Sequence, residues 1–250
     1  MKLTKTYIFG FHPVMEALRS GKELEKVYLR KGLKSESIPG LIGEMREKRI
    51  PFQFVPIEKI NRMCRKNHQG ILAQIAEIEY SDIEKIIPGL FEAGKMPIIL
   101  VLDRITDVRN MGAIARTAEG AGIHAMVIPT GESAGINADA VKTSSGALHS
   151  LPVCRTESLV KTLTFLKESG LQVIAATEKA EKPLYEADFT RPSAIVLGAE
   201  DTGIEKSVLQ LSDIQVKIPL FGTIPSLNVS VAASILMYEA IRQRLFSSIE

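Results

Sequence analysis

The C-terminal part of the chain alternates short apolar runs with amphipathic segments. Residues 97–102 (PIILVL) form an apolar run, which is typical of a strand buried on both faces of a parallel sheet. Strands that alternate with helices predict an α/β domain whose parallel sheet is covered on both faces. We expect further strands at 123–128, 173–176, 194–197 and 214–218, and a short strand that begins at Val153. Helices are expected at 110–120, 138–147, 159–168, 204–211 and 229–244.

Residues 1–78 show the same alternation on a smaller scale. They predict a small α/β domain of about 75 residues. The next segment, 79–95, is polar, contains Pro88 and Gly89 and has a weak helical period, so we interpret it as a linker with at most one short helix. The larger domain then covers 96–250. In the small domain, strands are expected at 24–30, 51–55 and 71–76, and helices at 12–19, 38–48 and 57–65.

Charge is distributed unevenly along the chain, although the formal net charge is only +2. Residues 1–70 contain 15 Lys or Arg and 7 Asp or Glu, a net charge of +8, so residues 71–250 carry a net charge of −6. Such an imbalance over a whole domain favours contact of the N-terminal part with RNA or DNA over a merely solvated basic face.

Composition disfavours several other classes of protein. No apolar run is long enough to cross a membrane, and the N-terminus lacks the apolar core and cleavage site of a signal peptide. Cys64 and Cys154 are isolated and the four histidines are scattered, so neither a disulfide framework nor a metal site is expected. These features favour a cytoplasmic protein with no membrane or metal partner.

Three polar junctions follow predicted strands in the larger domain, at 110–116, 198–203 and 219–228. The carboxyl ends of parallel strands meet at one edge of a sheet, so the three junctions could lie together. The sequence has no Ser-His-Asp order, no G-x-G-x-x-G after the first strand and no Walker lysine motif, which argues against those catalytic and nucleotide sites. Taken singly, each junction is equally compatible with an ordinary turn or capped helix.

The three junctions resemble the ordered motifs of the SpoU (TrmH-type) RNA 2′-O-ribose methyltransferases. The motifs read NMGAIARTA at 110–118, IVLGAEDTG at 195–203, and IPLFG at 218–222 followed by SLNVSVA at 226–232. Three motifs in the right order are a specific signal, and the resemblance covers most of the chain. Asp201 departs from the pattern, because many relatives have glycine at that position of the turn.

The N-terminal domain carries a second part of the resemblance. The segments IFGFHPV at 8–14 and HQGILA at 68–73 are similar to the family's RNA substrate-binding domain. The resemblance therefore implies a small N-terminal α/β RNA-binding domain of the L30e-like type and a C-terminal parallel-sheet domain with a deep trefoil knot, the SPOUT fold. It also implies S-adenosylmethionine as cofactor and a homodimer formed through the knot, with the helix at 229–244 as a candidate part of the interface.

The same resemblance implies two sets of site residues. Cofactor contacts are expected largely through the backbone, at Gly198, Ile218 and Leu227. Catalytic or positioning roles are expected for Asn110, Arg116, Glu200, Ser226 and Asn228.

The implied reaction transfers a methyl group from a sulfonium to a ribose 2′-hydroxyl. Arg116 matches the family's essential arginine. Because a guanidinium holds its proton tightly, we expect it to grip the target phosphate and polarise the ribose. The base is then the phosphate, water or a carboxylate such as Glu200. Structural alternatives are a helix cap for Asn110, an ion pair of Arg116 with Glu119 or Glu200, and a turn carboxylate for Glu200.

The basic N-terminal domain agrees with an RNA substrate. Lysine and arginine neutralise phosphates without reading bases, and single-stranded loops are the expected targets because their riboses can be splayed out. The most similar branch of the family methylates a guanosine of large-subunit ribosomal RNA, which is the expected partner. A transfer RNA substrate and a non-catalytic ribosome-assembly factor are the alternatives. Candidate RNA contacts are Arg30, Lys31, Arg62, Arg65, Lys66 and His68.

Overall fold

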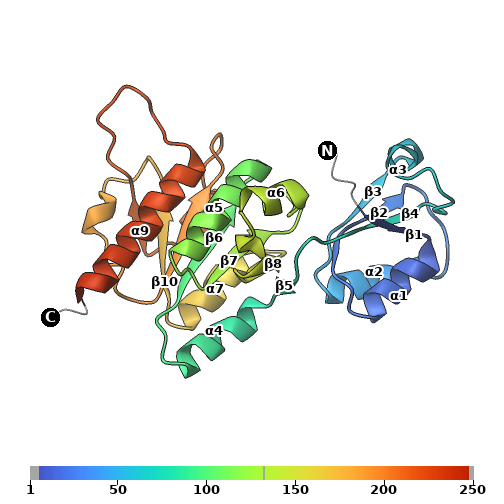
Figure 1. Ribbon diagram of the computed structural model, residues 1–250, viewed down its shortest axis with the longest axis horizontal. Helices are drawn as coiled ribbons and strands as arrows, with labels where there is room; N and C mark the ends of the chain where they lie inside the picture. Colours follow the sequence, from blue (N-terminus) through green and yellow to red (C-terminus); the bar gives the residue numbers. More distant parts are fainter. Residues whose placement is uncertain (1–5, 132, 248–250) are drawn as a thin grey trace. The chain divides into compact units, whose positions relative to one another are not determined.

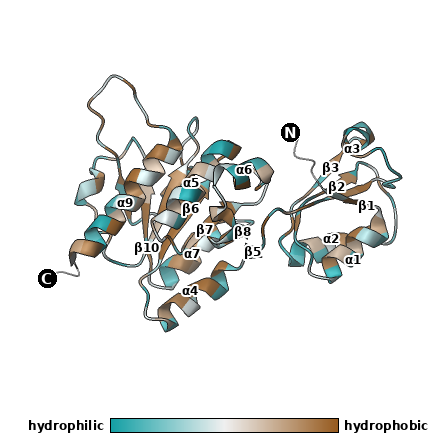
Figure 2. Ribbon diagram, in the orientation of Figure 1, coloured by the Kyte–Doolittle hydropathy of each residue, from teal (hydrophilic) through white to brown (hydrophobic). Residues whose placement is uncertain are grey.

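The computed structural model describes residues 6–131 and 133–247, and the chain forms two compact units (Figure 1). The smaller unit ends at Glu79 and also includes Gly135–Ala138, and the larger unit contains the remainder. Hydrophobic residues concentrate in the strands of both units, whereas the helices carry both hydrophobic and hydrophilic residues (Figure 2). Each unit therefore has the layered arrangement that the alternating pattern predicts.

The smaller unit is a four-stranded sheet with strand order β1-β4-β2-β3. Only the β2–β3 pair is parallel, and β4 is antiparallel to both of its neighbours. Helices α1 and α2 cover one face, and α3 lies on the other (Figure 1). The elements are β1 (Tyr7–Phe9), α1 (Phe11–Arg19), β2 (Leu24–Arg30), α2 (Ile38–Glu47), β3 (Phe52–Val55), α3 (Ile57–Met63) and β4 (Ile71–Ile75).

The larger unit is built on a seven-stranded sheet with strand order β11-β9-β10-β6-β7-β8-β5, in which every neighbouring pair is parallel. The strands are β5 (Tyr80–Ser81), β6 (Ile98–Asp103), β7 (Ala125–Pro129), β8 (Val153–Thr156), β9 (Gln172–Ala176), β10 (Ser193–Gly198) and β11 (Ile214–Val216). The α-helices are α4 (Ile83–Glu92), α5 (Val108–Gly120), α6 (Ala138–Thr143), α7 (Leu159–Glu168), α8 (Lys206–Leu209) and α9 (Val229–Ser247), and two short 3-10 helices span Ala147–His149 and Leu184–Glu186.

Two sequence-based expectations about these elements are wrong. Segment 79–95 is not a linker, because it forms β5 and α4, and Ile83 and Ile87 of α4 are buried in the core of the larger unit. The apolar residues of α4 recur at helical spacing, and the Asp82 side chain caps the helix by accepting from the Glu84 N–H at 3.2 Å. The expected helix at 138–147 ends at Thr143, because Ser145 and Gly146 adopt positive φ angles.

The order of the strands determines where a site can form. The first long strand, β6, lies in the middle of the sheet, with β7 on one side and β10 on the other. The chain thus builds outward in one direction from β6 and later returns to its other side, which makes the β6–β10 boundary a topological switch point. Because all strands are parallel, the segments after β6, β9, β10 and β11 leave the sheet at the same edge.

Candidate functional site

The three motif junctions converge at this edge through one carboxylate. Glu200 Oε1 accepts hydrogen bonds from Asn110 Nδ2 at 3.0 Å, from Asn228 Nδ2 at 2.6 Å and from the backbone N–H of Val229 at 3.0 Å. The two asparagines are also joined directly, because Asn228 Nδ2 lies 3.0 Å from Asn110 Oδ1. Residues from three distant parts of the chain therefore form a single network, which we call the Asn-Glu-Asn cluster (Asn110, Glu200 and Asn228).

Helix α5 holds the first motif in place by close packing. It begins two residues earlier than the sequence predicts, and Asp107 caps it by accepting from the Arg109 N–H at 2.6 Å. Asn110 is therefore not the helix cap, and its side chain is available to the cluster. A Cβ on Gly112 would lie only 2.7 Å from the carbonyl oxygen of Ala140, so glycine is needed where α5 meets α6.

The turn after β10 holds the second motif. Gly198 ends the strand, and the Gly203 N–H donates to the Ala199 carbonyl at 2.9 Å, which closes a tight turn. A Cβ on Gly198 would lie 2.2 Å from the backbone carbonyl carbon of Gly203, so only glycine fits. Asp201, the departure from the family pattern, is exposed and accepts from the Thr202 N–H at 2.9 Å, so its carboxylate serves its own turn.

The third motif leads into helix α9. Asn228 precedes the helix, and its Oδ1 accepts from the Ser230 N–H at 3.0 Å, as an N-cap side chain does. Asn228 thus caps the helix through Oδ1 while its Nδ2 binds Glu200. The Val229 N–H group at the helix start and the carboxylate of Glu200 are oppositely polarised, which favours their contact.

Arg116 lies one helical turn beyond Gly112 on α5 and is exposed. Within the part of the chain that the structure describes, Arg116 makes no hydrogen bond or ion pair, so the suggested pairing with Glu119 or Glu200 does not form. Its guanidinium is therefore free to bind an incoming anion, on the same helix that carries Asn110.

A pocket that is open to solvent lies beside the Asn-Glu-Asn cluster. It is lined by the three predicted cofactor residues Gly198, Ile218 and Leu227, and by two of the predicted catalytic residues, Glu200 and Ser226. The rest of its wall comes from apolar side chains and from the segments that follow β9, β10 and β11; this wall includes Thr177, Glu178, Leu197, Ile204, Val216 and Lys217. Sequence reasoning missed the contribution of β9, whose carboxyl end lies at the same edge.

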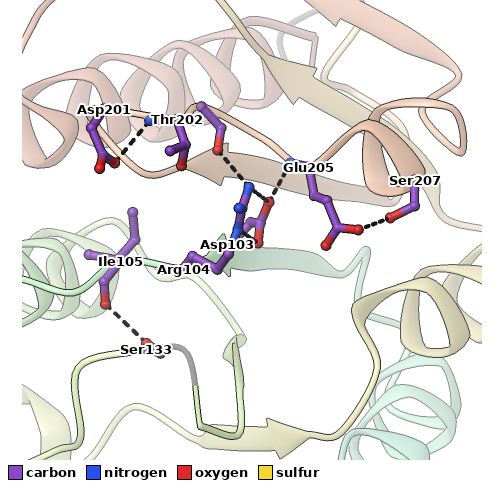
Figure 3. A network of polar contacts seen from close by, with 9 residues as sticks. Asp103, Arg104, Ile105, Ser133, Asp201, Thr202, Glu205 and Ser207 are labelled. Atoms are coloured by element: carbon purple, nitrogen blue, oxygen red, sulfur yellow. Dashed lines mark hydrogen bonds and ion pairs between the residues drawn. The ribbon is translucent and has the colours of Figure 1, made fainter.

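A second polar network, also missed in the sequence, supports the turn after β10 (Figure 3). Asp103 ends β6 and is only 1% exposed. Its carboxylate accepts from the Glu205 N–H at 2.6 Å and pairs with Arg104 Nε at 3.0 Å, while Arg104 Nη2 donates to the Gly203 carbonyl at 3.2 Å. The available signal was an acidic residue directly after the apolar run 97–102.

The predicted RNA contacts belong to the smaller unit. Their side chains are exposed with one exception, His68, which is 7% exposed. His68 Nδ1 accepts from the Gly70 N–H at 3.1 Å, and Nε2 lies 2.8 Å from Asn61 Oδ1. Both ring nitrogens are therefore used inside the fold, and the RNA contact expected for His68 is replaced by a structural role. The exposed residues are Arg30, Lys31, Arg62, Arg65 and Lys66.

Other kinds of site find no support among residues 6–131 and 133–247. No group of His, Cys, Asp or Glu side chains there could hold a metal ion. No described helix is long and apolar enough to cross a membrane. Cys64 and Cys154 are not joined in a disulfide.

Comparison with known proteins finds a matching protein family for each of the two units. Residues 97–238 match the SpoU rRNA methylase family, and residues 7–81 match the domain described as RNA 2′-O ribose methyltransferase substrate binding. The chain is 34% identical over 238 residues to a Bacillus subtilis protein named as a TrmH family tRNA/rRNA methyltransferase, covering 95% of this chain and 96% of that protein. It is 36% identical over 242 residues to a Staphylococcus aureus protein named in the same way, covering 96% of each.

The fold has solved counterparts. The crystal structure of the SpoU methyltransferase AviRb from Streptomyces viridochromogenes, in complex with AdoMet, superposes with a TM-score of 0.62 over 97% of this chain and 92% of that one, at 24% sequence identity. At this identity the likeness concerns the fold, which includes both the parallel-sheet unit and the small N-terminal unit.

Proposed function

Because the chain belongs to the SpoU rRNA methylase family and is thereby an S-adenosylmethionine-dependent RNA 2′-O-methyltransferase, we propose that it methylates a guanosine ribose of large-subunit ribosomal RNA. The observation that carries the methyl-transfer site of this proposal is the Asn-Glu-Asn cluster, which joins all three motifs beside one pocket. Membership of this family also implies that the larger unit contains the trefoil knot.

The lining of the pocket suits S-adenosylmethionine in chemistry. Its wall combines apolar side chains with a few polar groups, as small-molecule sites do. The glycine at 198 leaves backbone N–H and C=O groups accessible, and Ile218 and Leu227 provide apolar surface for an adenine ring. We assign these three residues to cofactor binding, with Ser226 near the methionine end. When bound, the cofactor supplies an electrophilic methyl group on a sulfonium.

The chain's own residues then have to align the acceptor and stabilise its developing charge. The Asn-Glu-Asn cluster fixes the start of α5 and the start of α9 relative to each other, so the residues around the reacting ribose are pre-positioned. In this proposal, Arg116 binds the phosphate of the target nucleotide and polarises the ribose hydroxyl. Glu200 Oε1 is already occupied by three donors, so the first role of Glu200 is to hold the site together.

The role of Arg116 can be tested by steady-state methylation of ribosomal RNA with tritiated cofactor. We expect Arg116→Lys to lower kcat by roughly 100-fold, because a lysine cannot reproduce the two-pronged guanidinium contact. The matched control is Arg109→Lys, on the exposed first turn of the same helix, which should retain turnover. Near-normal turnover of Arg116→Lys at every pH would exclude a specific guanidinium role.

The identity of the RNA needs a separate test. The relatives' names cover both tRNA and rRNA, and the basic N-terminal domain supports a large ribosomal RNA target, with the enzyme acting in the cytoplasm. Primer extension on ribosomal and transfer RNA from a deletion strain should show one pause lost from large-subunit RNA. A pause lost from a tRNA would select the alternative substrate. No lost pause, together with no cofactor binding by calorimetry, would indicate a non-catalytic assembly factor.

We also propose a homodimer that uses helix α9. Val231, Tyr238 and Leu245 recur every seven residues along this helix, and they are 47%, 54% and 63% exposed. Such an apolar stripe is the pattern of a helix that packs against a partner. Light scattering of Tyr238→Glu should give a monomer mass. A parent protein that is already monomeric would contradict the proposal.

A further inference from the structure

One face of the sheet in the smaller unit carries aromatic side chains where a second helix layer would otherwise lie. The register places Tyr7 opposite Gln74 and Gln74 opposite Lys26, so these three side chains share that face. In the next row, Phe9 and Tyr28 are both paired with Leu72, one from each side. Helices α1 and α2 cover the opposite face, so this row is on the side of α3.

Helix α3 covers this face only in part. Its Ile60 is buried against Val55 and Leu72, whereas Phe9 and Tyr28 are packed at the margin of that cluster and stay partly exposed. Strands are spaced about 4.8 Å apart, so the two rings lie roughly 10 Å from each other across Leu72. The face therefore presents two aromatic platforms, separated by one buried strand.

Lysine side chains gather over these rings. Lys26 Nζ and Lys59 Nζ lie 5.9 and 5.8 Å from the centroid of the Tyr28 ring, and Lys66 Nζ lies 5.5 Å from that of Phe9. Two ammonium groups next to the same ring repel each other, and burial followed by this repulsion lowers the pKa of Lys26. An anion that settled between the lysines would relieve this repulsion.

Aromatic rings interleaved with lysines match the chemistry of an unpaired polynucleotide. Bases stack on aromatic rings whatever their sequence, while ammonium groups contact the backbone phosphates. The alternative is that the rings merely shield the small cluster around Ile60. That alternative accounts for the partial burial of the rings. It does not explain why three lysine side chains lie over the Phe9 and Tyr28 rings.

We propose that this face, formed by Phe9 and Tyr28 with Lys26, Lys59 and Lys66, binds a single-stranded segment of the RNA substrate by base stacking. This proposal rests on the proposed function, because it specifies how the substrate-binding unit holds RNA. The face recognises an unpaired segment of the substrate RNA, and duplex RNA is disfavoured because its bases are not free to stack.

The chain contains no tryptophan, which permits a direct optical test. Tyr28→Trp places a single fluorophore on the face, and Phe54→Trp, at a 42% exposed position of neighbouring strand β3, is the matched control. Phe54 packs edge-on with Phe52, whose side chain lies on the α1–α2 side of the sheet. The full-length variants are titrated with a short unstructured RNA of mixed sequence, and with the duplex formed by that RNA and its complement.

We expect the single-stranded RNA to quench the emission of Tyr28→Trp strongly, the duplex to quench it weakly, and the Phe54→Trp emission to stay unchanged. RNA binding observed by fluorescence anisotropy without quenching at position 28 would overturn the proposal, and so would equal quenching at both positions. Quenching that depends only on protein concentration would instead identify a second copy on this face.

Affinity provides an independent measurement. Tyr28→Leu should weaken binding of the single-stranded RNA roughly ten-fold or more, whereas Tyr28→Phe should restore it. Each of Lys26→Gln, Lys59→Gln and Lys66→Gln should reduce the slope of log affinity against log salt by about 0.7, and Arg46→Gln on α2 should not. Unchanged slopes in all three lysine variants would contradict the proposal. Methylation of whole ribosomal RNA by the parent protein tests the proposed function separately.

Discussion

Substituting Gly198 by alanine tests whether the turn after β10 forms the cofactor site. The added Cβ would lie 2.2 Å from the carbonyl carbon of Gly203, 2.3 Å from the Ile204 nitrogen and 2.4 Å from the Gly203 oxygen. Carbon atoms in contact are normally about 3.5–4.0 Å apart, so the turn has to move by roughly 1 Å or more. All three atoms belong to the backbone, and no side chain can rotate away to make room.

This displacement has two expected consequences. Overpacking of this kind destabilises a fold by about 1–3 kcal/mol. The turn also carries Glu200, and a shift of about 1 Å in an aligned site costs roughly 100-fold in rate. Gly198→Ala should therefore weaken S-adenosylmethionine binding in calorimetry and lower kcat by about 100-fold, while circular dichroism still shows a folded protein.

Gly203→Ala is the matched control in the same turn. No atom lies within 4 Å of its added Cβ, so its only penalty is the φ angle of +66°, about 1 kcal/mol. Gly203→Ala should thus lose less cofactor affinity than Gly198→Ala. Normal cofactor binding by Gly198→Ala, or an equal loss in both variants, would refute the steric reasoning.

Three further predictions concern the support of the site and the pH dependence of stability. Gly112→Ala brings a Cβ to 2.7 Å from the Ala140 oxygen, so it should push α5 away from α6. We expect a loss of about 1–3 kcal/mol in stability and a lower turnover. A methylation rate equal to that of the parent would contradict this prediction. Asp103→Asn leaves the Arg104 guanidinium without its carboxylate and should lower the free energy of unfolding by about 1–3 kcal/mol in urea titrations, whereas an unchanged midpoint would exclude the support role. Burial, and then the charges of Lys95 and Arg244, lower the pKa of His124 below its ordinary 6.5. The unfolded chain then binds a proton that the folded chain does not, so stability should fall as the pH drops below about 6.5. His124→Gln should flatten this dependence, and an identical slope in the variant would contradict the assignment.

Most elements could be predicted because their cause is local. The strand predicted from the apolar run 97–102 is β6, and the helix predicted at 159–168 is α7. In both cases the observed ends lie within one residue of the predicted ends. The packing of segment 79–95 into the core was missed because Pro88 and Gly89 indicate a break. Helix α4 forms nevertheless, and its Ile83 and Ile87 are buried. Local pattern thus fails where a burial contact outweighs a helix-breaking residue.

The site could be predicted only in part, because its contacts are long-range. The motif residues could be identified from their resemblance to a family, but the strand order that places β10 next to β6 does not follow from local periodicity. The Asp103 carboxylate and the Glu205 N–H it binds are separated by 102 positions, and no spacing rule connects them. For His68 the local pattern suggested a role that long-range contacts replace. A histidine in a basic segment suggests RNA contact, but both ring nitrogens of His68 form hydrogen bonds within the smaller unit.

The turn from Gly198 to Gly203 couples the two halves of the proposed chemistry. Its inner side forms part of the pocket wall, and its Glu200 carboxylate holds the start of α5 through Asn110 and the start of α9 through the Val229 N–H. The base of the same turn is fixed to the end of β6 by Asp103 and Arg104. Anything that shifts the turn must therefore change cofactor binding and acceptor alignment together. Separate effects on the two, in variants of this turn, would mean that the pocket and the Asn-Glu-Asn cluster belong to different sites.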